Sequence, residues 1–250
     1  MASSNDAAAA VEARLTYYNG RGHGERVRYA LAAANVPYTE SFLTRPGDID
    51  AVCSKCLFGQ APLFESDGVR FVQSPLLEID GLQLSNSWAT VRHLAQKNGL
   101  TPPTAAAAAK ADAVMEQVRD YTVAGGFTAY GWAPGFFENT EIRDACLAHV
   151  SAAASRYLPT FEAAVEDGGF IVGSTPCWAD FQLLYLLNYT EELLPTTLAS
   201  NFQRLAQLRS ALNADARMQK HFAAHAKGLV SPPYMLECKE AQRPRTDILL

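Results

Sequence analysis

The chain has 250 residues, of which 48% are hydrophobic, and a formal net charge of -5 at pH 7. This length and apolar fraction can bury a sizeable core in one or two domains. The acidic balance, without a run of Lys or Arg, argues against nucleic acid or an anionic membrane as a partner, because both depend on basic patches. No apolar run approaches the roughly 20 residues of a membrane-spanning helix.

The cysteines and the start of the chain bear on its compartment. The five cysteines are an odd and scattered set, which favours reduced thiols over a disulfide framework. Cys53 and Cys56 lack a second Cys/His pair at metal-ligand spacing, so we expect no metal site. The opening MASSNDAAAAVEA lacks the basic and apolar segments of a secretory signal. We therefore expect a soluble cytoplasmic protein.

The first hundred residues alternate between strand-like and helix-like patterns. Hydrophobic periodicity and capping residues predict, in order, a strand at 14–18, a helix at 25–35, a strand at 38–44, a short helix at 48–56, a hairpin, and a helix at 87–97. A βαβ unit followed by a ββα unit is the order of a thioredoxin-like domain.

The second half is almost wholly helical. Residues 99–104 contain two prolines and form a linker. Beyond it the pattern predicts helices at 105–130, 141–166, 178–193 and 198–227. The expected fold class is α/β plus all-α, with a thioredoxin-like domain at 12–98, an all-helical domain at 105–230, and tails at 1–11 and 235–250.

Residues 73–93, QSPLLEIDGLQLSNSWATVRH, have the features of a small-acid binding site. Asp80-Gly81 supplies a hairpin turn, and Asn86 and Ser87 begin a helix. Free backbone N–H groups at a helix start favour a docked carboxylate. Before the hairpin, the backbone of Ser74 can pair with an extended peptide. This segment therefore predicts a site for a short acidic peptide.

The hairpin segment is duplicated. Residues 58–70 recur thirteen positions later at 71–83 with seven identities. The second copy runs directly into the following helix, so residues 58–70 are expected to be a surface insertion, where added length costs little. In the rival interpretation, the first copy forms the hairpin and residues 75–85 bulge out; a hybrid with strands from each copy is a third arrangement. The rival would line the site with Gln60, Ala61, Pro62, Gln73 and Ser74.

The segment 15–28, LTYYNGRGHGERVR, resembles the start of cytosolic glutathione transferases of the tyrosine type, such as the alpha, pi and sigma classes. The similarity extends through the hairpin and the helical half, over roughly 15–225. It implies a homodimeric transferase that conjugates the thiol of glutathione to hydrophobic electrophiles in detoxification. Glutathione is then a co-substrate, and no cofactor is needed.

The same resemblance assigns roles to individual residues. Tyr17 is the expected catalytic group that stabilises the glutathione thiolate. His23 stands where many relatives carry a second Arg, so a permanent cation is replaced by a group that titrates near ~6.5. Tyr130 is expected to face the electrophile. The expected glutathione-binding residues are Gln73, Ser74, Asn86, Ser87, Lys55, His23 and Asp120, with Gln60 and Ala61 if the first hairpin copy is used.

Two other functions stay open. One is a glutathione-transferase-like protein kept for binding or structure, which the duplicated hairpin and the missing basic residues favour. The other is a glutathione-dependent isomerase or peroxidase. Intact Tyr17 and the Gln/Ser pair favour the transferase.

A departure from the family concerns stability. Relatives begin a buried helix with a Ser-x-x-Asp capping box, whereas this chain has Cys177-Trp-Ala-Asp180. Because a thiol is a weak acceptor, we expect this cap to lose about 1 kcal/mol.

Overall fold

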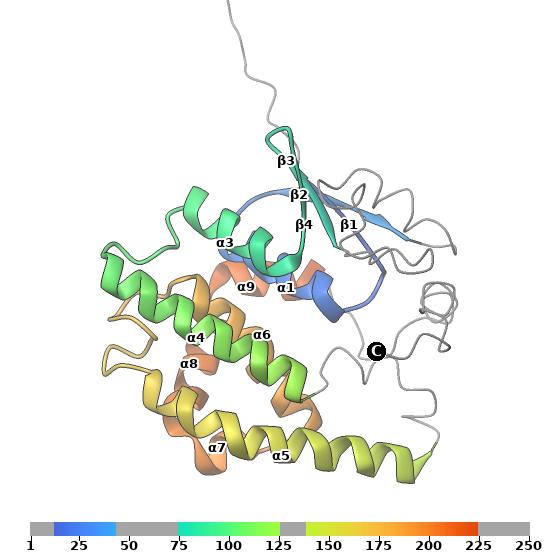
Figure 1. Ribbon diagram of the computed structural model, residues 1–250, viewed down its shortest axis with the longest axis vertical. Helices are drawn as coiled ribbons and strands as arrows, with labels where there is room; N and C mark the ends of the chain where they lie inside the picture. Colours follow the sequence, from blue (N-terminus) through green and yellow to red (C-terminus); the bar gives the residue numbers. More distant parts are fainter. Residues whose placement is uncertain (1–12, 44–74, 126–138, 225–250) are drawn as a thin grey trace, which may run out of the picture.

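A computed structural model describes residues 13–43, 75–125 and 139–224. Figure 1 shows the strands gathered at one end of the molecule and helices α4 to α8 at the other, with α1, α3 and α9 between them. The predicted short helix at 48–56 and the first hairpin copy at 58–70 lie outside the described residues, as do both tails.

The described residues form a sheet of four strands in the order β2-β1-β3-β4. Parallel strands β1 (Ala13–Tyr17) and β2 (Tyr38–Phe42) are joined by helix α1 (Gly22–Ala33). Strand β3 (Leu76–Ile79) runs antiparallel to both β1 and β4 (Leu82–Ser85). The predicted thioredoxin-like topology is confirmed, although α1 begins three residues before the predicted 25–35 and β2 ends before the predicted limit of 44.

The hairpin β3–β4 is built from the second repeat and continues into α3. Its turn at Asp80 and Gly81 has positive φ at both residues, 52° and 76°, as a two-residue hairpin turn requires. Since the first repeat is not described, which copy lines the site stays a prediction.

In the described ranges, seven helices follow the last strand. They are α3 (Ser87–Lys97), α4 (Ala105–Ala124), α5 (Thr140–Ala164), α6 (Trp178–Leu193), α7 (Thr197–Asn201), α8 (Gln203–Asn213) and α9 (Ala216–Ala224). The bounds of α3 and α6 agree with the sequence prediction. Helix α4 ends at Ala124, where Gly125 donates its N–H to the Tyr121 carbonyl, and the rest of the predicted 105–130 helix is not described.

The single helix predicted at 198–227 is wrong, because α7, α8 and α9 replace it. Phe202, with φ -137° and ψ 80°, breaks the helix between α7 and α8. The carboxylate of Glu162 on α5 then accepts the N–H groups of Arg204 and Leu205, both at 2.9 Å. A cap supplied by another helix satisfies the amides that the break exposes.

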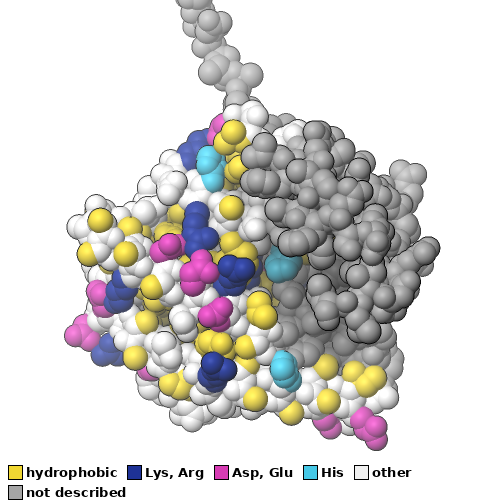
Figure 2. All heavy atoms as spheres, viewed as in Figure 1, with side chains coloured by type: hydrophobic (Ala, Val, Ile, Leu, Met, Phe, Trp, Pro, Cys, Tyr) yellow, Lys and Arg dark blue, Asp and Glu magenta, His cyan; other side chains and the backbone are white. Residues whose placement is uncertain are grey.

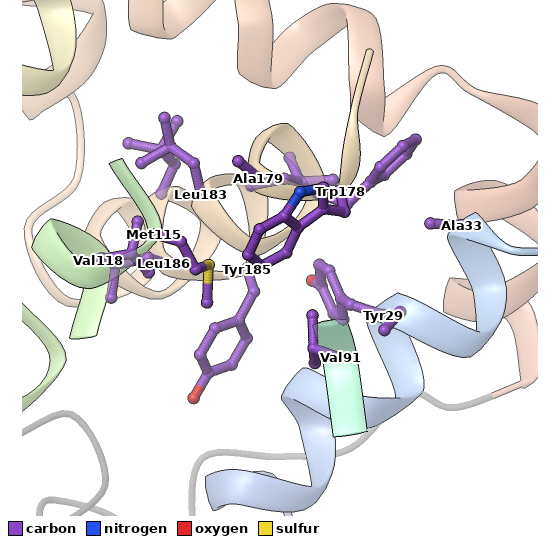
Figure 3. Packing of buried hydrophobic residues seen from close by; sticks show 14 of the residues in the cluster. Tyr29, Ala33, Val91, Met115, Val118, Trp178, Ala179, Leu183, Tyr185 and Leu186 are labelled. Carbon is purple, nitrogen blue, oxygen red and sulfur yellow. The ribbon is translucent and has the colours of Figure 1, made fainter. Parts of the chain in front are cut away.

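Helix α6 forms the centre of the core. It is apolar on nearly every face and almost entirely buried, as expected of a helix surrounded by other elements. Figure 3 shows Trp178 and Tyr185 of α6 between Tyr29 of α1 and Met115 of α4. Because α6 contacts both α1 and α4, the sheet domain and the helical domain share one core.

The surface carries charges of both signs. On the face shown in Figure 2, Lys and Arg side chains are interspersed with Asp and Glu over the described helices. No helix in the described ranges is long and apolar enough to cross a membrane.

Candidate functional site

Tyr17 lies at the end of β1 and its ring rests against the first turn of α1. The Tyr17 hydroxyl oxygen accepts a hydrogen bond from the backbone N–H of His23, with an N···O distance of 3.1 Å. A Cβ placed on Gly24 would lie 2.2 Å from Cδ1 of Tyr17, and one on Gly22 would lie 2.6 Å from its hydroxyl oxygen. Gly22 also has a φ of +51°. The Gly-x-Gly turn therefore makes room for the ring.

The electrostatics keep Tyr17 protonated. Its side chain is only 3% exposed. Burial raises the pKa of Tyr17 well above its usual value, and the His23 N–H and the Arg28 charge offset only part of that rise. Because the oxygen already accepts the His23 hydrogen bond, the hydroxyl proton is left to donate, and no described residue accepts it. A neutral phenol at the start of a helix can thus donate to an anion.

The start of α3 forms a second polar position. Asn86 has φ 71° and ψ 100°, an unusual backbone conformation for a residue other than glycine. Its side-chain oxygen accepts the N–H groups of Trp88 at 3.2 Å and Ala89 at 3.5 Å. The side chain of Ser87 is buried and makes no hydrogen bond to any described residue. Ser87 therefore remains available to a ligand at this helix start.

Helices α1 and α3 are joined near their first turns. The guanidinium carbon of Arg26 on α1 lies 3.4 Å from the centre of the Trp88 ring on α3. This contact places the helix start that holds His23 beside the one that holds Asn86 and Ser87. The predicted residues of this part of the chain thus lie at or beside the starts of two neighbouring helices, with Tyr17 and His23 at the start of α1 and Asn86 and Ser87 at the start of α3.

A buried ion network holds the turn between β1 and α1. Arg28 pairs with Glu25 at 2.9 Å and with Glu40 at 2.7 Å, and it donates to the carbonyls of Tyr18 and Gly20. Burial alone would raise the pKa of Glu25, but contacts with His221 and Arg28 bring that pKa below its usual value. The sequence prediction assigned no role to this network; the Glu25-x-x-Arg28 spacing on one helix face was its available signal.

For the other predicted site residues, the structure gives fewer contacts or does not describe them. His23 touches the Tyr17 hydroxyl through its main chain. Asp120 is exposed on α4 and forms no ion pair with the rest of the described chain. Six predicted residues lie outside the described ranges: Gln73, Ser74, Lys55, Gln60, Ala61 and Tyr130.

A cavity of about 410 Å³ lies elsewhere, between the end of α1, the start of β2, and α9. Asn35, Tyr38 and Lys220 are among its lining residues, and no predicted site residue is.

Within the described ranges, no group of three or more His, Cys, Asp or Glu side chains is placed to hold a metal ion.

Comparison with known proteins agrees with this arrangement. The family models described as the N-terminal and C-terminal domains of glutathione S-transferase match residues 13–96 and 128–225. Glutathione S-transferase alpha M14 of Sus scrofa is 33% identical over 204 residues, which cover 80% of this chain and 82% of the relative.

The fold is also similar to those of solved glutathione S-transferase structures. The glutathione S-transferase of Ascaris lumbricoides has a TM-score of 0.69 and 28% identity, covering 87% of this chain and 99% of its own. A monomeric glutathione S-transferase of Necator americanus has a TM-score of 0.68 and 21% identity, with coverage of 87% and 99%. Two domain models that together span both halves of the chain, and relatives above 30% identity, show that the chain belongs to the glutathione S-transferase family.

Proposed function

We propose that this transferase conjugates the thiol of glutathione to hydrophobic electrophiles, with Tyr17 as the hydrogen-bond donor to the thiolate. The observation that carries the proposal is the bond from the His23 N–H to the Tyr17 hydroxyl oxygen. It fixes the oxygen as an acceptor on the helix side and leaves the proton for a ligand. The raised pKa of Tyr17 suits a donor that stays neutral throughout.

The chemistry needs only a stabilised thiolate. A free thiol titrates near ~8.5, and lowering that value by about 2 units requires about 2.7 kcal/mol of preferential thiolate binding. The Tyr17 hydroxyl and the start of α1 both favour the anion. The thiol proton passes to solvent, and the sulfur lone pair forms the new bond to the electrophilic carbon. With chlorodinitrobenzene, the carbon–chlorine bond breaks and chloride leaves with the bonding pair.

Glutathione binding is proposed to use the start of α3. The free side chain of Ser87, next to the strained cap at Asn86, supports a carboxylate-binding role for this helix start. In the proposal, Gln73, Ser74, Lys55 and His23 complete the pocket, Asp120 contacts the γ-glutamyl amine, and Tyr130 faces the electrophile.

A homodimer and a cytoplasmic location belong to the same proposal. Asp120 would reach the amine from a neighbouring subunit, and Val123, one turn away on the same helix, is 74% exposed. The Necator americanus relative is monomeric, so the assembly needs its own test. Sedimentation equilibrium of the full chain should give twice the mass of one chain, and Val123→Asp should shift it towards a single chain. A concentration-independent monomer would contradict the dimer.

The experiment that tests the function is conjugation of glutathione to chlorodinitrobenzene, paired with calorimetric titration of glutathione. Tyr17→Phe should lose most of the turnover and retain binding, because only the hydroxyl is removed. Tyr18→Phe is the matched control, since its ring packs edge-on against Tyr17 at 5.3 Å. Binding without turnover in the parent would favour an isomerase, peroxidase or binding role. No binding at all would favour the structural role.

A further inference from the structure

Arg26 on α1 is a buried cation that has no counterion among the described residues. Its side chain is fully buried, and Nη2 donates a hydrogen bond to Oγ1 of Thr122 at 3.3 Å. Its Nε and Nη1 atoms find no acceptor in the part of the chain that the structure describes. Arg28, two residues along, is equally buried and has two carboxylate partners. An uncompensated buried charge is costly, so its presence calls for an explanation.

The groups around Arg26 moderate its charge without neutralising it. The guanidinium lies 3.4 Å from the centre of the Trp88 ring and 5.5 Å from that of Tyr185. Among the described residues, the ionisable groups that act on Arg26 are Tyr185 on α6, Tyr17 on β1 and Arg119 on α4, and none of these is a carboxylate. Burial lowers the pKa of Arg26 to about 10, so the side chain is still charged at neutral pH.

The position of Arg26 relates it to the Tyr17 hydroxyl. Gly22 and Arg26 are four residues apart and so lie on one face of α1. The guanidinium carbon of Arg26 lies 5.5 Å from the centre of the Tyr185 ring. The Tyr185 hydroxyl donates to the Gly22 carbonyl at 3.4 Å. The Tyr17 hydroxyl lies against the Cα of the same glycine. Arg26, Tyr185 and Tyr17 are therefore arranged around one residue.

We propose that Arg26 supplies the fixed positive charge that favours the ionised thiol of glutathione at Tyr17, acting through the buried interior without touching the ligand. The inference rests on the proposed function, because it places the thiolate at Tyr17. His23 does not carry a permanent charge, whereas Arg26 does. The contact with the Trp88 ring holds the Arg26 guanidinium in place inside the protein. The bound thiolate would then be an anion that the Arg26 charge acts on, since no carboxylate of the described residues is among the groups that act on Arg26.

The expected effect follows from Coulomb's law. At an effective dielectric constant of ~20, two unit charges shift each other's pKa by about one unit when about 10 Å separates them, and we take this as the size of effect expected of a charge that does not touch the ligand. Removing the charge should therefore raise the pKa of the bound thiol by about one unit. At neutral pH the thiolate fraction, and with it kcat/KM, should fall by up to about tenfold and recover as the pH is raised.

The test is an ultraviolet titration of the thiolate of enzyme-bound glutathione in four forms of the full chain: the parent, Arg26→Met, Arg26→Lys and Arg92→Met. Arg92 is the matched control, because its guanidinium also lies over a tryptophan, Trp178, but is neutralised by Asp112 and Glu116. Arg26→Met should raise the thiol pKa by about one unit, while Arg26→Lys and Arg92→Met should keep it within about 0.3 units.

A second readout separates the charge from a purely structural role. S-methylglutathione has no ionisable thiol, so its Kd should change by less than about threefold in Arg26→Met if the site is intact. If Arg26→Met does not fold, Thr122→Asp replaces it: the new carboxylate would neutralise Arg26 in place and should also raise the thiol pKa. An unchanged thiol pKa in Arg26→Met, or in Thr122→Asp where that variant replaces it, overturns the proposal.

The two proposals fail in different ways. If Tyr17→Phe leaves the thiol pKa unchanged, the role of Tyr17 is wrong, whatever Arg26 does. If Tyr17→Phe raises the pKa and Arg26→Met does not, only the inference about Arg26 is wrong.

Discussion

The backbone nitrogen of His23 lies 3.1 Å from the hydroxyl oxygen of Tyr17 and donates to it. The contact orients the hydroxyl from the first turn of α1 through the main chain, independently of the side chain at position 23. A strand end and a helix start are thereby joined at the atom that the proposed chemistry uses.

The first prediction distinguishes the effect of the His23 main-chain hydrogen bond on activity from the effect of its side chain. His23→Pro removes the N–H at a first-turn position where helices tolerate proline, whereas His23→Ala keeps it. Losing one hydrogen bond should lower kcat/KM of His23→Pro by about two- to tenfold relative to His23→Ala. Steady-state conjugation of glutathione measures the ratio, and equal rates would show that this bond does not orient the hydroxyl.

The second prediction concerns the space in front of the Tyr17 ring. A methyl group added in Gly24→Ala would lie 2.2 Å from Cδ1 of Tyr17, so the ring must move. Overpacking of this kind should cost about 1–3 kcal/mol of unfolding free energy and lower turnover. Urea unfolding measures the cost. In the background of Tyr17→Ala, where the ring is absent, the same substitution should cost much less; an equal cost in both backgrounds would contradict the contact.

The third prediction is a pH dependence of stability. The pKa of Glu25 is lower in the folded chain than its usual value, so its contribution is fully present above the unfolded value of about 4.3 and is lost as pH falls through the folded pKa. Glu25→Gln should cost about 1–3 kcal/mol at pH 7, because Arg28 and His221 lose a buried partner, and progressively less below about pH 4.

Glu78→Gln is the control for this series. Glu78 pairs with Arg14 at 3.0 Å near the surface, where an ion pair is worth less than about 1 kcal/mol. Urea unfolding of both variants at pH 7 and at acidic pH makes the comparison. A cost for Glu25→Gln that does not diminish in acid would rule out the ion pair as its source.

The fourth prediction concerns the helix cap at Cys177. Asp180 accepts the N–H groups of Cys177 and Ile171, both at 2.8 Å, so its half of the capping box is intact. Burial raises the pKa of the Cys177 thiol to about 12, leaving a neutral sulfur as the weak acceptor. Cys177→Ser should add about 0.5–1 kcal/mol and raise Tm by a few degrees. Cys146→Ser, away from any cap, should not; equal shifts would refute the explanation.

The sequence predicted the elements whose limits are local. Helix α3 begins at the Asn86 cap, and α6 is a long apolar segment after Pro176, so both were predicted with the observed bounds. The break at Phe202 was missed because its new helix start is capped by Glu162 from α5, a contact that no local pattern reveals.

In the site, too, features set by the local sequence could be predicted, whereas contacts between distant segments could not. Tyr17 could be predicted from a motif within one segment. The stack of Arg26 on Trp88 could not, because it joins residues far apart in the chain and depends on how α1 packs against α3. The contribution of His23 was sought in its imidazole, whereas the contact with Tyr17 is made by its backbone.

The most direct test of the role of Tyr17 is the pKa of the glutathione thiol when bound to the parent and to Tyr17→Phe, followed through the ultraviolet absorbance of the thiolate. We expect the bound thiol to titrate about 2 units below the free value of ~8.5 in the parent, and about 1 unit higher than that in Tyr17→Phe, where Arg26 still favours the anion. The same lowered pKa in both proteins would contradict it, because the Tyr17 hydroxyl would then not be the group that stabilises the thiolate.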